Sequence, residues 1–192
     1  MKVVGICGSH REESTTLFFL KKALDVIEKE GIETEIIELW NKDIRPCIVC
    51  DQCKKAYTCS QEDDVMDIYE KLVNADGIIM ASPVYYAMVS GRLKNLMDRS
   101  LPQRRNGMKL AGKVGGAIAV GASRNGGQEL VCRQIVTWMH LHEMITVSDR
   151  VTAHFGGTGW VPRGTKSEDD QTGIETSVNL GKKMAETLKR LE

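Results

Sequence analysis

Short apolar runs alternate with longer amphipathic stretches along the whole chain. The apolar runs have the length of strands, and we expect strands at Val3–Cys7, Glu33–Leu39, Gly77–Ala81, Val114–Val120 and Ile145–Ala153. The stretches between them repeat apolar residues at helical spacing, which predicts helices at Thr15–Glu30, Asp63–Asn74, Gly91–Ser100, Gln128–His142 and Gly173–Leu191.

The alternation of strands and helices predicts the fold class. An α/β chain of this order folds as an open, doubly wound parallel sheet with helices on both faces. The first, third and fourth apolar runs lack strict alternation, which is typical of interior strands. Residues 33–39 alternate charged and apolar side chains, as an edge strand does.

Composition narrows the class of protein. The chain has 192 residues, 42% of them hydrophobic, with no shift in composition along its length, so we expect one domain over residues 1–192. Basic and acidic residues number 26 each, which argues against nucleic acid as a partner. No apolar run is long enough to span a membrane, and residues 2–7 are too short for a signal peptide, so we expect a cytoplasmic protein without a membrane partner.

Four cysteines lie close together after the second predicted strand. Cys47, Cys50, Cys53 and Cys59 form the pattern C-x2-C-x2-C-x5-C within the loop at residues 43–60. Three thiols at intervals of three residues are typical of an iron-sulfur cluster, with Cys59 as the predicted fourth ligand. A zinc site usually takes two separated ligand pairs, and a disulfide loop needs an oxidising compartment; both remain alternatives.

The loop after the first strand is rich in hydroxyl groups. In a parallel sheet this loop emerges at the carboxyl edge, where ligands bind, and it leads directly into a helix. Ser9, Ser14 and Thr16, with Arg11, suit a phosphate group at the helix N-terminus. The alternative is a simple helix cap at Ser14 or Thr15. The chain contains neither a P-loop nor a G-x-G-x-x-G turn.

Two further loops at the same edge have the composition of a site for a flat ring. The third strand runs into Ser82, Pro83, Val84, Tyr85 and Tyr86, whose aromatic rings suit a planar ligand or belong to the core. The fourth strand runs into a second loop, where glycines let the backbone approach a ligand or form a plain turn. Its candidate residues are Ser123, Asn125, Gly126, Gly127 and Gln128.

These motifs occur together in one known family. They are G-S-x-R-x2-S-x-T at residues 8–16, S-P-V-Y at 82–85, L-K-x3-D-R at 93–99, G-G-Q-E at 126–129 and the cysteine motif at 47–59. Together they resemble the iron-sulfur flavoproteins of the flavodoxin-like NAD(P)H-dependent FMN reductase superfamily, over nearly the whole chain. His10, where the family often has proline, and Arg124, in a loop that is usually small, depart from the pattern.

The resemblance implies a flavodoxin-like five-stranded sheet of order 2-1-3-4-5, one FMN and one [4Fe-4S] cluster per chain. It also implies a redox protein that takes electrons from a ferredoxin-like donor and passes them through the cluster to FMN and on to a small-molecule acceptor. We expect a homodimer or homotetramer. The alternatives are an NAD(P)H-dependent FMN or quinone reductase with an incidental cysteine loop, and a zinc-stapled regulatory module.

The remaining reactive residues are predicted to be structural. Cys7 and Cys132 are expected to be buried thiols, and His140 and His142 cannot share a helix face as a metal pair. His154 is expected to end the fifth strand as a packing residue. The glycine-rich segment 155–164 carries aromatic side chains, so we expect a subunit contact or a flavin lid, or a loop packed on its own helix.

Overall fold

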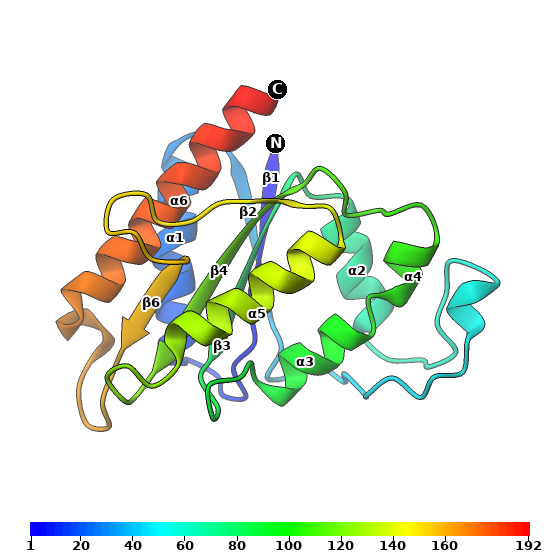
Figure 1. Cartoon of the computed structure of the whole chain (residues 1–192), viewed down its shortest axis with the longest axis horizontal. Helices are drawn as coiled ribbons and strands as arrows, with labels where there is room; N and C mark the ends of the chain where they lie inside the picture. The colour runs from blue at the N-terminus through cyan, green and yellow to red at the C-terminus, as the bar shows by residue number, and fades with distance from the viewer.

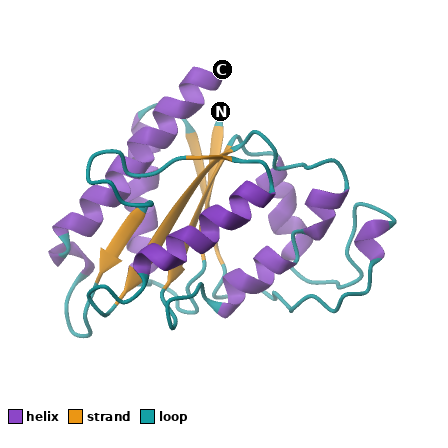
Figure 2. Cartoon of the chain, viewed as in Figure 1, coloured by secondary structure: helices purple, strands orange, loops and turns teal.

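The computed structural model describes residues 1–192 as a parallel sheet between two layers of helices (Figures 1 and 2). Its six strands follow the order β2-β1-β3-β4-β5, and β6 also pairs with β4. The strands are β1 (Lys2–Cys7), β2 (Glu33–Glu38), β3 (Gly77–Pro83), β4 (Val114–Gly121), β5 (Ile145–Thr146) and β6 (Gly157–Trp160). The predicted doubly wound order is confirmed, with β2 at the edge.

Six α-helices connect and cover the strands. They are α1 (Thr15–Lys29), α2 (Val65–Val73), α3 (Gly91–Asp98), α4 (Leu101–Arg105), α5 (Gln128–Leu141) and α6 (Gln171–Leu191), with short 3-10 turns η1 (Gln52–Lys54) and η2 (Ser167–Asp169). Five of the helices match the predicted ones, whereas the short α4 was not expected from the sequence. None of the helices combines the length and apolar character that a membrane-spanning segment requires.

Side chains of successive strand residues point to opposite faces of the sheet and pack in two separate cores, one on each face. Val4 and Ile6 of β1 pack in a core of 25 buried residues with α2, α3 and α5. Val3 and Cys7 pack in a core of 20 buried residues with α1 and α6. Because helices cover both faces, the loops that follow the strands collect at one edge of the sheet (Figure 1).

The fifth strand is split in two, which corrects the predicted continuous strand over Ile145–Ala153. β5 pairs with the start of β4 and β6 with its end, and residues 147–156 leave the sheet between them. Buried Asp149 turns the chain there, because its carboxylate accepts hydrogen bonds from the N–H groups of Val151 and Thr152.

Two further expectations change with the split strand. His154 lies in the excursion rather than at a strand end, where its Nδ1 is 2.6 Å from the hydroxyl of Thr152. Residues 157–160 of the glycine-rich segment form strand β6 rather than a loop, but they do pack on α6, where the N–H of Thr158 donates to the hydroxyl of Thr176 at 3.0 Å; a subunit contact stays a prediction. The glycines suit the position, because a Cβ on Gly156 would overlap the carbonyl oxygen of Ala117.

Candidate functional site

The β1–α1 loop gathers hydroxyl groups at the N-terminus of α1. Ser14 is the N-cap, and its Oγ accepts a hydrogen bond from the N–H of Leu17 at 3.2 Å. Buried Ser9 accepts one from the N–H of exposed Arg11 at 3.1 Å. Thr16 is 1% exposed, and its hydroxyl has no partner in the chain. An unpartnered buried hydroxyl is costly, so this loop fits an anionic ligand that would accept its hydrogen bond.

Two buried serines join this loop to the one after β3. The hydroxyl of Ser90 donates to the carbonyl oxygen of Gly8 at 2.6 Å, and the N–H of Ser90 donates to the hydroxyl of Ser82 at 2.9 Å. Gly8 allows this approach, because a Cβ there would lie 3.0 Å from the Cβ of Leu93. Sequence reasoning missed Ser90, although its place before Gly91 marks it as a helix cap.

The loop after β3 ends in a tight turn that holds two tyrosines in solvent. Tyr85 and Met88 exchange backbone hydrogen bonds of 3.0 and 2.9 Å across Tyr86 and Ala87, which both have positive φ angles, as in a type I′ turn. Tyr86 is 100% exposed and Tyr85 48%. The alternative that these rings belong to the core is therefore wrong, and their contact with a planar ligand stays a prediction. Pro83 ends β3, and Val84 is half-buried beside the turn.

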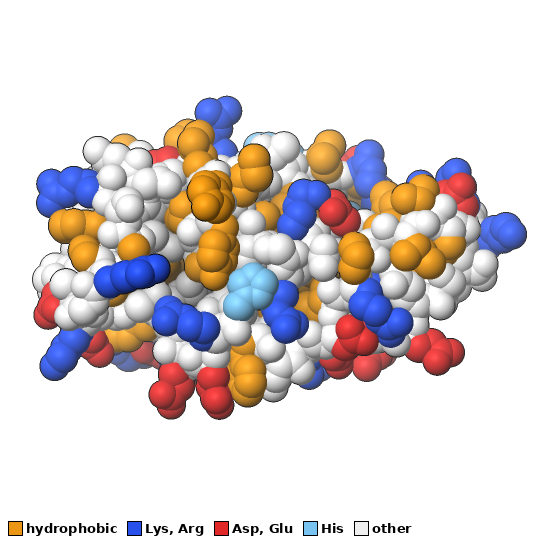
Figure 3. Space-filling view, turned by 90° about the horizontal axis from the view of Figure 1, so that it is seen from below, with side chains coloured by type: hydrophobic (Ala, Val, Ile, Leu, Met, Phe, Trp, Pro, Cys, Tyr) orange, Lys and Arg blue, Asp and Glu red, His pale blue; other side chains and the backbone are white.

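The β4–α5 loop packs directly against this turn. Gly127 has a φ angle of 108°, and a Cβ there would lie 2.5 Å from the Cβ of Ala87. Buried Gln128 donates a hydrogen bond of 3.0 Å to the carbonyl oxygen of Ser123, which closes the loop around Asn125 and Gly126. The structure thus brings the predicted residues of all three loops to one edge of the sheet, where Figure 3 shows exposed hydrophobic side chains near the centre.

The predicted cluster ligands gather at a different place. All four thiols, of Cys47, Cys50, Cys53 and Cys59, line one cavity together with residues of α3 and α4. The loop runs out to one end of the long axis of the molecule (Figure 1). The Oγ of Ser60 lies 2.9 Å from the Sγ of Cys50, and this hydrogen bond lowers the pKa of the Cys50 thiol. The thiolate is the form that binds metals.

The donor set of this cavity fits a cluster better than zinc. No three His, Cys, Asp or Glu side chains converge closely enough to hold a single metal ion. Zinc needs its sulfur ligands about 2.3 Å from one ion, whereas a cluster spreads four thiolates over several iron atoms. Four thiols spaced around a shared cavity suit the second arrangement. All six cysteines are free, so the disulfide alternative finds no support.

Side chains at the C-terminal ends of α3 and α4 anchor the cysteine loop and the segment that leads from it into α2. Arg99 donates two hydrogen bonds to Asp63, of 2.7 and 2.9 Å, and both side chains are almost completely buried. Arg105 donates to the Sγ of Cys53 at 2.8 Å, and Asn106 donates to the carbonyl oxygen of Cys53 at 3.1 Å. Sequence reasoning gave none of these anchors a role, because their partners lie 36 to 53 positions away.

Ionisation supports the anchor at Asp63. Burial opposes the charged form, but the hydrogen bonds from Arg99 and from the backbone N–H groups of Arg45 and Val65 outweigh it and hold the pKa of Asp63 below its usual value. The carboxylate therefore stays charged beside Arg99. The pair ties the start of α2 to the end of α3.

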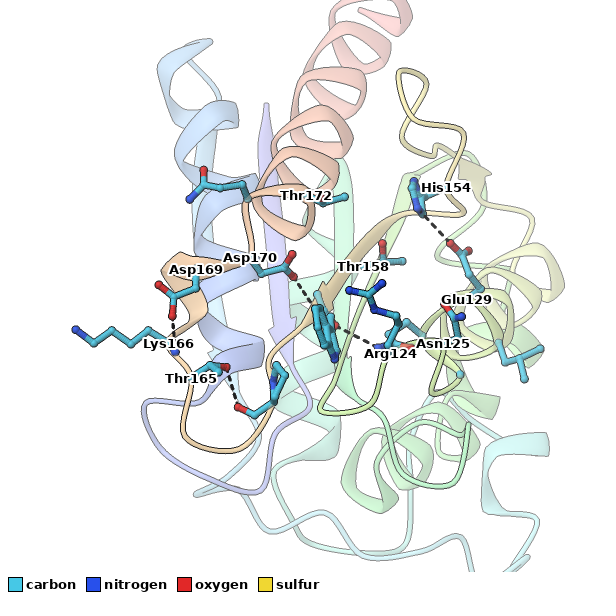
Figure 4. A pocket seen from close by; sticks show the side chains of 17 residues that line it. Arg124, Asn125, Glu129, His154, Thr158, Thr165, Lys166, Asp169, Asp170 and Thr172 are labelled. Atoms are coloured by element: carbon cyan, nitrogen blue, oxygen red, sulfur yellow. Dashed lines mark hydrogen bonds and ion pairs between the residues drawn. The ribbon is translucent and has the colours of Figure 1, made fainter.

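A larger groove of about 900 Å³ lies between the β4–α5 loop and the segment from Thr158 to Thr172. The guanidinium of Arg124 lies 4.5 Å from the ring centre of Trp160, and the N–H of Trp160 donates to Asp170 at 2.6 Å (Figure 4). The groove shares Asn125, Gly127 and Gln128 with the predicted ring site. It includes no residue of the loops at 9–16 and 82–86.

The cysteines and helix histidines that were expected to be structural make packing or local hydrogen-bond contacts. Cys7 and Cys132 are 1% and 0% exposed, and burial raises the pKa of both thiols. The Nε2 of buried His142 lies 2.9 Å from the hydroxyl of Ser100, and the Nε2 of His140 lies 3.0 Å from the hydroxyl of Thr146. The two histidines thus serve separate local contacts.

Comparisons with known proteins agree with this geometry. The family model described as NADPH-dependent FMN reductase matches residues 1–158. An iron-sulfur flavoprotein of Methanocaldococcus jannaschii is 51% identical over 193 residues, with both chains fully covered. The chain belongs to the iron-sulfur flavoproteins of this FMN reductase family. Another iron-sulfur flavoprotein, of Methanosarcina thermophila, is 41% identical and is matched over 100% of this chain and 97% of its own.

Solved structures show the same fold at low identity. A flavodoxin, the WrbA-like protein from Agrobacterium tumefaciens, superimposes with a TM-score of 0.69 at 18% identity, covering 100% of this chain and 98% of that one. This iron-sulfur flavoprotein is thus flavodoxin-like in fold, as its sequence motifs implied. Its cysteine loop follows β2, at the predicted place.

Proposed function

We propose that this protein is an FMN-dependent oxidoreductase that passes electrons from a ferredoxin-like donor, through a [4Fe-4S] cluster, to FMN and on to a small-molecule acceptor. The observation that carries the proposal is the cavity lined by all four thiols of the cysteine loop, on a flavodoxin-like sheet. A cluster supplies single electrons and FMN takes up one or two, so together they join one-electron and two-electron chemistry.

In this proposal residues 1–192 act as a single FMN-binding domain, with residues 43–60 as its cluster-binding loop. The phosphate of FMN lies at the N-terminus of α1, where Thr16 has an unpartnered hydroxyl and Ser9 and Arg11 lie nearby. The ring rests beside Ser82–Tyr86 and Ser123–Gln128, and Ala87, which follows Tyr86 in the turn, packs against Gly127 of the second loop. The chain needs no acid-base residue for electron transfer itself.

The donor approaches the cysteine loop in this proposal. Ile48 and Val49 are 61% and 78% exposed beside Cys47 and Cys50, and Figure 3 shows hydrophobic and charged side chains mixed at this end. Exposed Lys55 adds positive charge that suits an acidic partner, whereas Lys54 is paired with Asp51. Electrons that arrive there enter the chain close to the proposed cluster ligands.

In this proposal electrons pass between copies of the chain, and the placement of the two sites supports it. Hydrogen bonds from Arg92, Asn95 and Arg99 hold the start of the cysteine loop along α3, and Arg105 holds Cys53 against α4. The loop therefore runs away from the Gly8–Ser14 loop (Figure 1). A second copy in a homodimer or homotetramer would bring its own flavin edge to the cluster, which supports an oligomer as the working form.

Analysis of protein purified without oxygen tests the proposal. Iron, acid-labile sulfide and FMN should be present and zinc absent, and Cys50→Ala should lose iron and sulfide while it retains FMN. Cys132→Ala serves as the control, because that buried thiol lies in α5, outside the cysteine loop, and should leave the cluster intact. Zinc without sulfide, or full iron in Cys50→Ala, would reject the proposal.

A second candidate rests on the description of the matching family, NADPH-dependent FMN reductase. In that case NAD(P)H would reduce the flavin directly, and the cysteine loop would be incidental to catalysis. The lack of a G-x-G-x-x-G turn in the chain favours the ferredoxin-like donor. Rapid bleaching of the flavin by NAD(P)H in Cys50→Ala would favour the second candidate.

A further inference from the structure

One cation of the structure points directly at a thiol of the cysteine loop. The Nη1 of Arg105 donates a hydrogen bond to the Sγ of Cys53 at 2.8 Å. Asn106, the next residue, donates to the carbonyl oxygen of the same cysteine at 3.1 Å. The C-terminal end of α4 therefore holds both the side chain and the backbone of Cys53. The Arg105 side chain is 31% exposed, and solvent therefore screens its charge only in part.

Two other cations near the loop are more closely matched by carboxylates. Arg99 lines the same cavity close to Cys59, but both of its terminal nitrogens bond to Asp63. Lys54 bonds to Asp51 at 2.9 Å. Arg105 reaches that carboxylate only at 3.6 Å, and its shorter contact is with sulfur. Of these cations, Arg105 is the one whose charge is least compensated beside the thiols.

We propose that Arg105 sets the reduction potential of the cluster, by donating its hydrogen bond to the Sγ of Cys53. The inference rests on the proposed function, in which Cys53 is a cluster ligand. Each electron taken up from a one-electron donor adds one negative charge beside Cys53, and no proton moves, because the guanidinium stays protonated throughout. A fixed positive charge and hydrogen bond at the ligand sulfur stabilise that added charge and so raise the potential.

Redox titration of the intact protein tests this role. The midpoint potential of the cluster is measured anaerobically, with dithionite and mediators, by the electron paramagnetic resonance signal of the reduced cluster. Arg105→Gln should disfavour the reduced cluster about tenfold, which is about 59 mV more negative for a one-electron couple. Arg105→Lys keeps the positive charge but loses the planar guanidinium. The potential of its cluster should lie between those of the wild-type protein and Arg105→Gln.

A matched control separates the hydrogen bond from a general charge effect. Lys55 lies in the same loop and is exposed, so Lys55→Gln makes the same change of charge without removing a donor from a sulfur. Its shift should be much smaller than that of Arg105→Gln. Equal shifts in the two variants, or no shift in Arg105→Gln, would overturn the inference.

A spectroscopic measurement covers the case in which Arg105→Gln fails to assemble a cluster. Resonance Raman bands of the iron–Sγ bonds should shift in deuterated water in the wild-type protein, and this shift should change in Arg105→Lys. An identical isotope shift in both proteins would also overturn the inference. A wild-type protein without any cluster would instead reject the proposed function, so the two failures are distinguishable.

Discussion

The hydroxyl of Thr16 is buried at the first turn of α1 without a hydrogen-bond partner. If it serves the phosphate of FMN, Thr16→Val should weaken FMN by about 1.5–3 kcal/mol, because a hydrogen bond to a charged group is lost. Riboflavin, which lacks the phosphate, should bind as before. Arg11→Gln should discriminate between the two ligands in the same direction. Isothermal titration with both ligands measures the difference.

The same variant should have the opposite effect on stability. Removing an unsatisfied buried hydroxyl relieves a desolvation cost, so Thr16→Val without flavin should unfold at the same or a higher urea concentration. Equal losses of FMN and riboflavin affinity would show that the phosphate lies elsewhere. A less stable flavin-free protein would show that the hydroxyl has a structural partner.

His142 makes the stability of the folded chain depend on pH. Burial and the nearby Arg104 lower its pKa from 6.5 to about 4, while in the unfolded chain it titrates near its ordinary value. Between these values the unfolded state binds the proton more readily, so stability is lost as the pH falls from about 6.5 to about 4, by roughly 2–3 kcal/mol. Urea unfolding across this range measures the slope.

Two variants isolate that slope. His142→Gln should flatten the pH dependence of the unfolding free energy between about pH 6 and pH 4.5, which lies between the two pKa values. This holds whatever the effect of the substitution on overall stability. His140→Gln should keep it, because that neighbour is exposed. Asp63 does not interfere, because its lowered pKa means that its contribution is lost only below the ordinary carboxyl pKa of 3.8. An unchanged slope in His142→Gln would contradict the assignment.

At the scale of elements, the Asp63–Arg99 pair fixes the cysteine loop between α2 and α3. Asp63→Asn should cost about 3–5 kcal/mol of unfolding free energy, because it leaves the Arg99 charge buried without its partner. Asp98→Asn is the control, since its pair with Lys94 is about half exposed and is worth no more than about 1 kcal/mol. Urea denaturation measures both. Similar small losses would show that the buried pair does not hold the loop.

The regular elements could be predicted from the sequence because their signals are local. The continuous apolar runs of β1, β3 and β4 indicate interior strands, and the alternation in β2 indicates an edge strand. The helices of the two layers follow from their spacing of apolar residues. The order of the strands needed the family motifs, since strand pairing is not encoded in any one run.

What escaped prediction depends on contacts between distant residues. The split of the fifth strand depends on buried Asp149 and on the close fit of Gly156 against Ala117. The apolar run that begins at Ile145 gives no sign of either contact. The five-residue α4 is too short for a periodic signal. The candidate ligands of both sites could be predicted from motifs, whereas Ser90 and Arg105 act on residues 82 and 52 positions away.

At the scale of the whole molecule, the cluster of one subunit should reduce the flavin of another subunit. Two variants that each lack one cofactor should therefore restore electron transfer when they share an oligomer. Cys50→Ala protein, which retains FMN but lacks the cluster, should be reduced slowly by reduced ferredoxin. Mixing it with wild-type protein stripped of FMN, and letting subunits exchange, should restore rapid bleaching of the flavin. Stopped-flow absorbance measures the phase.

Stripped Cys50→Ala protein is the control for that mixture and should restore nothing. A rapid phase in the wild-type protein that no mixture recovers would mean that the electron stays within one chain. In that case the cysteine loop would have to move toward the Gly8–Ser14 loop during transfer.

The two ends of the cysteine loop are bonded to each other. The N–H of Asp43 donates to the carboxylate of Asp64 at 2.7 Å, and the N–H of Asp64 donates to the carbonyl oxygen of Asp43 at 3.1 Å. The loop is therefore closed at its base before it reaches any cysteine, and β2 and α2 would need little adjustment if a short connection replaced residues 46–62 and left core residue Ile44 and the Asp63–Arg99 pair in place. The loop is in this sense a detachable insert: a lineage can gain or lose it without rebuilding the sheet, and an engineer can graft it onto a flavin-binding scaffold that has never carried iron.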